Sequence, residues 1–331
     1  MKLGGMTAGR VRGVLGRTCL AMMGVGLLCT VVSCGSDDRS DNGSGAVTIT
    51  HRLGETTVEG TPQRVVTLGN QWLDATLALG VPPVGYADNI SLGAKSKVPW
   101  APDSLGQAKV LNMGADVAEQ IAALEPDLIL VPGFMVDKAM YEKLSRLAPT
   151  IGPVTADAQV DQWSDQVTTL GKVLHREGEA SRVVSSVDGR IDAVAERYPG
   201  LKGKTFLTCM LTGPAQLMVL ADPKDGSAAL FTRLGMGIPE RIAREAPTGG
   251  RLAMSPERLG DLTSDMLICG AMPAFEEKFK QLPGYADLPS VRNNGIAFVD
   301  TVTISAINTP TALSVPYVLD RLDSTFAAVG K

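Results

Sequence analysis

Residues 119–130 read EQIAALEPDLIL, and residues 257–268 read ERLGDLTSDMLI. In each stretch a glutamate opens a short helical segment, apolar residues follow at the second and fifth steps, and an aspartate stands eight residues after the glutamate, before an apolar run. Because a short helix that leads into a buried strand is typical of α/β proteins, both stretches indicate that class. Their similarity predicts two lobes of related construction; the alternative is a chance likeness between two helix-to-strand connections.

Apolar runs alternate with helical patterns on both sides of these stretches. This alternation predicts parallel sheets covered by helices. In the first half we expect a hairpin over 47–58, strands over 64–68, 84–87 and 128–131, and helices over 71–79 and 137–147. In the second half we expect strands over 204–210, 216–220, 266–270 and 296–299, and helices over 228–234 and 311–328.

One long helix is predicted between the two halves, over residues 177–198. Its apolar residues recur at three- and four-residue steps, and Pro199-Gly200 follows it. At ~1.5 Å per residue such a helix is about 33 Å long, enough to run along a small domain. We therefore expect an N-terminal α/β lobe over 47–176, a connecting helix over 177–198 and a C-terminal α/β lobe over 199–331. Each lobe should be Rossmann-like, with a central parallel sheet.

The N-terminus has the features of a lipoprotein signal. Basic residues precede an apolar run over 20–32, which is about the length of a signal-peptide core and short for a bilayer span. The run ends in Val-Val-Ser-Cys at 31–34, which resembles the bacterial lipobox. We expect a signal peptide over 1–33, a lipid on Cys34 and a flexible Gly/Ser/Asp/Asn-rich tether over 34–46. An ordinary cleaved signal peptide is the alternative.

The charge of the remaining chain limits its partners. Four of the 31 basic residues lie in 1–33, which leaves 27 basic and 35 acidic residues. An acidic chain without a basic cluster argues against nucleic acid as a partner, and against docking on anionic lipid by charge alone. Beyond Cys34 only Cys209 and Cys269 remain, both in apolar runs. A disulfide between them is possible, but two packed thiols are the expected state.

Signatures of enzymes are missing from the sequence. The two histidines, His51 and His175, form no paired-histidine metal motif, and no nucleophile elbow or phosphate-binding loop occurs. The scattered carboxylates Asp74, Asp88 and Asp157 are not paired by any motif. We therefore expect neither an enzyme nor a resident metal or cofactor.

The chain resembles a family at three stretches: PQRVVTL over 62–68, ALGVPPVG over 78–85 and EQIAALEPDLI over 119–129. They look like the iron-siderophore and cobalamin binding proteins of ABC importers, whose two lobes are joined by a single helix. The resemblance covers residues 47 to 329. It implies a ligand held in a cleft between the lobes, with iron present only as part of a bound chelate.

The resemblance also implies a partner, the permease dimer of the importer. In this family a surface glutamate on each lobe docks onto arginine pockets of the permease, and the matching positions are Glu119 and Glu257. A glutamate in the first turn of a helix interacts favourably with the helix dipole and stays ionised, so two such anions can contact arginines through charge-assisted bonds. The alternative is that each glutamate only stabilises its own helix.

Ligand selection should come from the loops that follow the strands, since these face the cleft. The candidates are Trp72, Tyr86, Trp100 and Phe134 in the first lobe, and Met210, Met218, Arg251 and Phe275 in the second. Aromatic planes suit the flat faces of a ferric chelate, and an arginine can neutralise an anionic one. Each could instead be a packing or surface residue.

A ferric siderophore is the expected ligand, with haem or cobalamin as the alternative of the same importer class. Because both histidines lie outside the expected cleft, haem would need Tyr86 or a methionine as its axial ligand, or no protein ligand. A non-transport surface protein for adhesion or sensing is a further alternative, although it would be expected to lose one docking glutamate. The protein should act as a monomer on the outer face of the membrane, and the single stiff helix between the lobes suggests less lobe closure than flexible linkers would allow.

Overall fold

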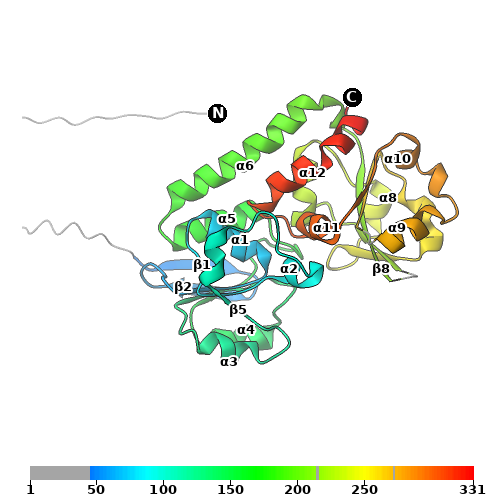
Figure 1. Cartoon of the computed structure of the whole chain (residues 1–331). Helices are drawn as coiled ribbons and strands as arrows, with labels where there is room; N and C mark the ends of the chain where they lie inside the picture. The colour runs from blue at the N-terminus through cyan, green and yellow to red at the C-terminus, as the bar shows by residue number, and fades with distance from the viewer. Residues whose placement is uncertain (1–44, 214–215, 271–272) are drawn as a thin grey trace, which may run out of the picture. The chain divides into compact units, whose positions relative to one another are not determined.

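Two five-stranded sheets organise the chain (Figure 1). The computed structural model describes residues 45–213, 216–270 and 273–331. The predicted signal peptide, Cys34 and nearly all of the tether lie outside these residues. None of the described helices is long and apolar enough to cross a membrane.

The first sheet is parallel throughout, as predicted for both lobes, with strand order β5-β4-β3-β6-β7. Its strands are β3 (Val65–Leu68), β4 (Gly85–Ala87), β5 (Lys109–Val110), β6 (Leu128–Leu130) and β7 (Thr150–Ile151). The predicted hairpin forms β1 (Val47–His51) and β2 (Gly54–Val58) beside it. β3 is buried on both faces, because Val65 packs into one apolar cluster and Val66 into another.

Helices cover both faces of this sheet. They are α1 (Asn70–Ala78), α2 (Asn89–Ala94), α3 (Val117–Ala122), α4 (Lys138–Leu144) and α5 (Trp163–Val173). α1 and α5 share a core with Val65, whereas the apolar side chains of α3 and α4 pack around Val66. A short 3-10 helix, η1 (Asp103–Gln107), precedes β5.

The second sheet is mixed, with strand order β10-β9-β8-β11-β12. Its strands are β8 (Phe206–Gly213), β9 (Gln216–Leu220), β10 (Arg251–Met254), β11 (Met266–Gly270) and β12 (Ile296–Val299). β8, β11 and β12 run parallel, while β9 pairs antiparallel with both β8 and β10. The predicted central parallel sheet is therefore confirmed for β8, β11 and β12, and β9 and β10 add an antiparallel edge that the prediction did not include. Only two residues separate β8 from β9, too few for the crossover that a parallel pair needs.

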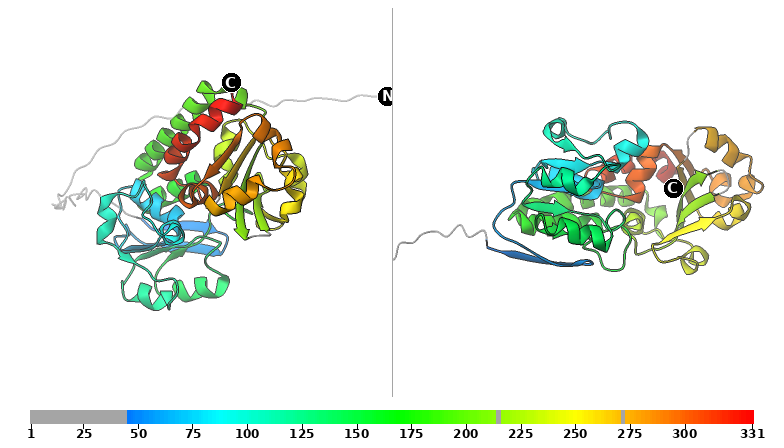
Figure 2. Two further views of the ribbon diagram at one scale, coloured as in Figure 1. Left: turned by 45° about the vertical axis from the view of Figure 1, so that its right-hand side comes forward. Right: turned by 90° about the horizontal axis from the view of Figure 1, so that it is seen from below.

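Further helices surround the second sheet (Figure 2). They are α7 (Ala229–Arg233), α8 (Glu240–Arg244), α9 (Pro273–Lys280), α10 (Pro289–Arg292), α11 (Thr301–Asn308) and α12 (Ser314–Val329). The 3-10 helices are η2 (Pro199–Leu201), η3 (Gly226–Ala228), η4 (Pro256–Leu262) and η5 (Tyr285–Asp287).

The long helix α6 (Glu177–Arg197) follows α5 and leads to the second sheet. It buries Ala180, Val187 and Ile191, and it lies along α12 (Figures 1 and 2). Arg190 and Arg197 pair with Asp320 and Asp323 of α12 at 2.8 and 3.3 Å. These ion pairs are exposed, so the apolar contacts of the helix supply most of its stabilisation.

Residues 152–162, which lie between β7 and α5, contact the second lobe. The backbone oxygen of Val160 accepts from Gly226 N at 2.9 Å, and Val160 N donates to the buried carboxylate of Asp225 at 3.3 Å. The oxygen of Asp161 accepts from Gln71 Nε2 of α1 at 3.1 Å. The lobes are thus held by more than α6.

The two similar sequence stretches have the same structural role. Asp127, directly before β6, accepts from the backbone nitrogens of Gln63 and Arg64 at 2.7 Å each, just ahead of β3. Asp265, directly before β11, accepts from the backbone nitrogen of Thr205 at 2.8 Å, just ahead of β8. In both lobes the aspartate therefore fixes the start of the neighbouring parallel strand, which argues against a chance likeness.

Cys209 and Cys269 form a disulfide, so the expectation of two packed thiols is corrected. The two cysteines stand opposite each other on the neighbouring strands β8 and β11, with a Cα–Cα distance of 4.7 Å. That separation falls within the range that a disulfide requires. The sequence alone could not show that these two strands are neighbours in register.

Candidate functional site

The loops at the carboxyl ends of β3, β4 and β6 meet at Gly69. This glycine has φ of +83°, and a Cβ built on it would lie 3.1 Å from Pro132, 3.3 Å from Met135 and 3.5 Å from Asn89. A side chain here would be strained by the backbone and crowded by its neighbours. Gly69 therefore lets the three loops approach one another at the edge of the sheet where α/β proteins bind ligands.

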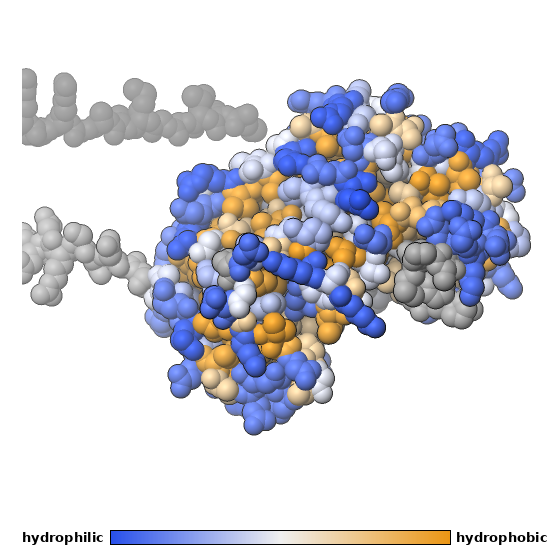
Figure 3. Space-filling model, viewed as in Figure 1, coloured by the Kyte–Doolittle hydropathy of each residue, from blue (hydrophilic) through white to orange (hydrophobic). Residues whose placement is uncertain are grey.

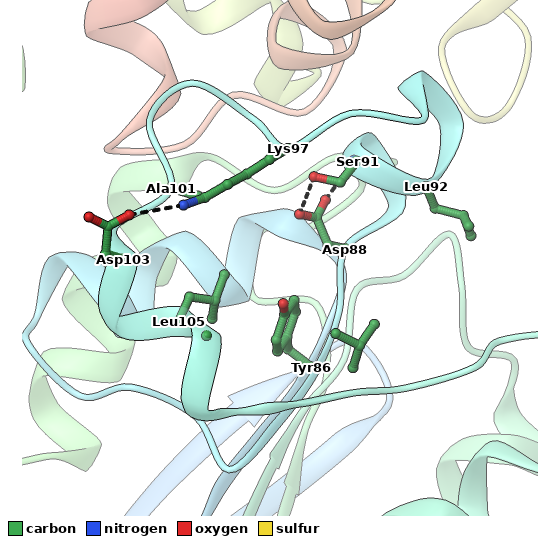
Figure 4. Close-up of a pocket in the computed structure, with 10 residues that line it drawn as sticks. Tyr86, Asp88, Ser91, Leu92, Lys97, Ala101, Asp103 and Leu105 are labelled. Carbon is green, nitrogen blue, oxygen red and sulfur yellow. Dashed lines mark hydrogen bonds and ion pairs between the residues drawn. The ribbon is translucent and has the colours of Figure 1, made fainter.

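A pocket of about 480 Å³ lies beside these loops (Figure 4). Its lining comes from β4, α2, η1 and the end of β5: Tyr86, Asp88, Ser91, Leu92, Lys97, Ala101, Asp103, Leu105, Gly106 and Val110. This volume is within the usual range for small-molecule sites. All ten residues belong to the first lobe, and α2, which forms one wall, lies against α11 of the second lobe (Figure 1).

The charged groups of the pocket already have partners. Asp88 caps α2, and its carboxylate accepts from Ser91 N at 2.8 Å, Ser91 Oγ at 2.6 Å and Asn70 Nδ2 at 2.8 Å. Lys97 Nζ pairs with Asp103 at 3.3 Å on the exposed rim (Figure 4). The lining thus has two carboxylates and one ammonium group, and the ammonium is already neutralised.

Apolar side chains form most of the remaining wall. Leu92 is 69% exposed and Val110 is 58% exposed, unusually high values for large aliphatic residues. Figure 3 shows apolar surface over the segment around β5. Leu92 and Val110 therefore give this side of the pocket an exposed apolar surface that is suited to contacts with another apolar surface.

Tyr86 places a phenol in this pocket. Burial, and then repulsion from the charge of Asp88, raise the pKa of the Tyr86 hydroxyl above its ordinary value. The phenol therefore stays protonated at neutral pH and can act as a hydrogen-bond donor. Of the predicted aromatic ligand residues, Tyr86 is the one that lines the pocket.

Two predicted ligand residues are instead packing residues. Trp72 is fully buried in α1, and its Nε1 donates to the oxygen of Val131 at 3.2 Å. Trp100 is half-buried, with its Nε1 bonded to Asp74 Oδ2 at 2.8 Å and its ring 5.2 Å from that of Tyr317. Both indoles therefore pack within the fold, because large aromatic side chains fill cores as readily as they line ligand sites.

The other predicted ligand residues lie outside the pocket lining. Phe134 is 36% exposed in the loop after β6, next to the loops that meet at Gly69. Met210 and Met218 are half-buried and stand opposite each other on β8 and β9. Phe275 lies in α9, and its side chain is not among those that the structure describes.

Arg251 begins β10, which corrects its predicted place in a loop. Its Nη2 lies 2.9 Å from Ser227 Oγ and 3.3 Å from the fully buried carboxylate of Asp225. The charge of the Arg251 guanidinium is therefore already paired with the buried carboxylate of Asp225. Its Nη1 is buried without a hydrogen-bond partner.

Both predicted docking glutamates are exposed in the first turn of a short helix. Glu119 lies in α3, where Asp116 caps the helix by accepting from Glu119 N at 3.1 Å. Glu257 lies in η4, where Ser255 Oγ accepts from Glu257 N at 3.3 Å. The predicted short helical segment is thus an α-helix at Glu119 and a 3-10 helix at Glu257.

The described residues contain no group of three His, Cys, Asp or Glu side chains that could hold a metal ion. His51 is buried on β1, where its Nε2 lies 2.9 Å from Thr56 Oγ1 and desolvation lowers its pKa. His175 is exposed after α5. Both histidines are therefore away from the pocket.

Most residues of the pocket lining were not among the predicted ligand residues. Asp88, Ser91 and Leu92 follow directly after β4, and an aspartate before a short helical segment is an N-cap signal that would have placed them at the carboxyl end of the strand. Lys97, Leu105 and Val110 gave no such signal, because their positions depend on how the long connection from α2 to β5 folds.

Comparisons with known proteins agree with this architecture. Residues 65–303 match a periplasmic binding protein family. The Fe(3+)-citrate-binding protein YfmC of Bacillus subtilis is 28% identical over 293 residues, which cover 86% of this chain and 90% of YfmC. The ferric enterobactin-binding periplasmic protein FepB of Escherichia coli is 25% identical over 301 residues, covering 84% of this chain and 90% of FepB.

Solved structures show the same fold. A periplasmic solute binding protein from Mycobacterium smegmatis superposes with a TM-score of 0.73 at 28% identity, covering 87% of this chain and all of that one. PiaA of Streptococcus pneumoniae in complex with ferrichrome gives a TM-score of 0.73 at 24% identity, covering 86% and 98%. The matched family segment spans more than half of the chain and includes strands of both sheets. The chain therefore belongs to the periplasmic binding protein family, and it is an extracytoplasmic binding protein rather than an enzyme.

Proposed function

We propose that the protein captures a ferric siderophore and delivers it to an ABC permease. The observation that carries this proposal is the pocket at the carboxyl ends of β4 and β5, with its exposed apolar side chains Leu92 and Val110 and the phenol of Tyr86. A chelate presents iron inside an organic shell, so the protein needs to contact the shell and not the metal. YfmC and FepB, which the chain resembles at low identity, are named for ferric chelates.

The charges of the pocket favour a chelate of low net charge, such as a ferric trihydroxamate. Asp88 and Asp103 are both negative, and Lys97 is paired with Asp103. A strongly anionic chelate would be repelled by the carboxylates without an unpaired cation to compensate.

Haem is the second candidate, because Tyr86 offers a phenol within the pocket. A tyrosine binds haem iron through its oxygen, a bond that favours the ionised phenol. Since burial and the charge of Asp88 raise the pKa of Tyr86, ionisation is disfavoured and the chelate remains the preferred ligand. No feature of the pocket lining specifically favours cobalamin.

For delivery, Glu119 and Glu257 serve as the two docking anions, one on each lobe. Both are exposed and both lie in a first helical turn, where the helix dipole favours a negative charge. Cys34 carries the lipid that keeps the protein near its permease, which raises the effective concentration for docking. The acyl chains provide the membrane affinity, and the binding protein acts as a monomer.

A titration tests this proposal. The purified protein is titrated with ferric hydroxamate, catecholate and carboxylate chelates, haem and cobalamin, and tryptophan fluorescence is followed, since Trp100 lies next to the pocket. We expect saturable quenching with the hydroxamate at the lowest concentration. Tighter binding of haem would reverse the order of the two candidates, and no response to any compound would reject the proposal.

A further inference from the structure

The loop between α2 and η1, residues 95–102, forms one side of the pocket, and we call it the pocket loop. Lys97 and Ala101 of this loop line the pocket. The ion pair of Lys97 with Asp103 is exposed on both sides and stabilises little. Val98 buries an apolar side chain, which packs but cannot form a hydrogen bond to the rest of the fold. Trp100 has such a bond.

Trp100 joins the pocket loop to both lobes. Its Nε1 donates to Asp74 Oδ2 on α1 at 2.8 Å, and its ring lies 5.2 Å from that of Tyr317 on α12. Tyr317 is in turn fixed by its hydroxyl, 3.2 Å from Thr303 Oγ1 of α11. The indole therefore spans the contact between the first and the second lobe.

Asp74 is the centre of this contact. Its Oδ2 also accepts from Thr311 Oγ1 at 2.6 Å, and both residues are 1% exposed. Thr311 Oγ1 also accepts from Ser314 N at 2.9 Å, so it is bonded to the first residue of α12. One carboxylate oxygen thus connects a helix of the first lobe, the pocket loop and a helix of the second lobe.

A second bond on the same face of α1 supports the contact. Gln71, one turn before Asp74, donates from Nε2 to the oxygen of Pro310 at 3.1 Å. Because Gln71 and Asp74 both reach the segment just before α12, the relative position of α1 and α12 is fixed at two points.

We infer that Asp74 is a positioning residue for the ligand: through Trp100 and Thr311 it holds the pocket loop and the second lobe in the arrangement that binds the chelate, although it touches no ligand itself. This inference rests on the proposed function, because it takes the pocket as the ligand site. The charged form of Asp74 should hold its two donors most firmly, since hydrogen bonds to a carboxylate are stronger than those to a neutral group.

The ionisation of Asp74 gives the inference a specific readout. Burial raises its pKa to about 7 although the bonds from Thr311 and Trp100 lower it, and repulsion from Asp88, the charged group that acts on it, adds to the rise. Ligand affinity should therefore increase as the pH rises through about 7, when the carboxylate forms. A group that served only stability would not give the affinity this pH profile.

Asp74→Asn tests the inference, because it keeps the shape of the side chain and removes the charge. Chelate titrations from pH 5.5 to 8.5 should show a rise for the wild type, and for the variant a flat profile with affinity about fivefold lower at pH 8.5, as expected for exchanging a charged acceptor for a neutral one. Trp100→Phe keeps an aromatic ring on Tyr317, removes the donor, and should weaken binding similarly. Its affinity for the ferric chelate is measured by equilibrium dialysis, because the change also removes the fluorescent reporter beside the pocket. It decides the matter if Asp74→Asn fails to fold.

Tyr86→Ala is the control for the pocket. If Tyr86→Ala weakens binding while Asp74→Asn and Trp100→Phe bind as the wild type with its pH profile, the inference is wrong and the proposed function stands. If Tyr86→Ala also binds as the wild type, the pocket is not the ligand site, and both the inference and the proposed site fail.

Discussion

At the scale of single residues, hydrogen bonds fix two tryptophans of the first lobe. The indole nitrogens of Trp72 and Trp100 donate to Val131 and Asp74, although both residues were predicted to contact the ligand. Whether a tryptophan faces a cavity or a core depends on which loops meet above it, and a single sequence does not contain that information. Tyr86 follows the same kind of pattern and does line the pocket.

The buried Asp74 also makes a prediction for stability. Its pKa is about 7 in the folded protein, above its ordinary value of 3.8, so the folded state holds the proton more tightly than the unfolded state. The free energy of unfolding should therefore fall as the pH rises from about 4 to 7, by at most about 1.4 kcal/mol per pH unit, and level off above 7.

Urea unfolding at several pH values measures this contribution. Asp74→Asn has no group to titrate and should lack this component of the slope, with the difference from the wild type growing up to about pH 7. Equal slopes for the two proteins would show that the carboxyl of Asp74 does not change its pKa on folding.

At the scale of elements, the sequence was most informative where the pattern was local. Strands β9, β11 and β12 have the predicted bounds, and α6 ends one residue earlier than expected. β5 and β7 were missed because two-residue strands are too short for any periodicity. β10 was missed since its pairing with β9 depends on the hairpin of β8 and β9 rather than on its own residues.

The disulfide between β8 and β11 leads to a prediction of its own. It joins residues 60 positions apart, and closing a loop of that length should stabilise the fold by about 4 kcal/mol in the chain-entropy model. Replacing both cysteines, Cys209→Ala with Cys269→Ala, should lower the free energy of unfolding by a similar amount. A reducing agent should destabilise the wild type and leave the double variant unchanged.

Thiol titration in denaturant provides the control for this prediction. The protein beyond Cys34 should show no free thiol before reduction and two afterwards. Two reactive thiols before reduction would restore the expectation of packed, unpaired cysteines.

At the scale of the whole molecule, the repeated stretches link the construction of the lobes to delivery. In each lobe the aspartate of the stretch fixes the start of a central strand, and eight residues earlier the glutamate is exposed in a helical first turn. The position of each glutamate is therefore tied to the sheet of its own lobe. If the proposed docking holds, the distance between the two glutamates depends on how the two lobes are placed, and a permease that contacts both would respond to that distance.

This arrangement predicts how substitutions at Glu119 and Glu257 affect uptake. A permease with two arginine pockets should lose affinity with either change, and both together should nearly abolish uptake of the chelate by cells, because each removes a charge-assisted contact. Chelate affinity of the purified variants should stay normal, since both glutamates lie outside the pocket lining.

Glu196→Ala, on the exposed side of α6, is a matched control and should leave uptake unchanged. Normal uptake by the variant Glu119→Ala with Glu257→Ala would mean that the glutamates only stabilise their own helices, and that delivery uses another surface.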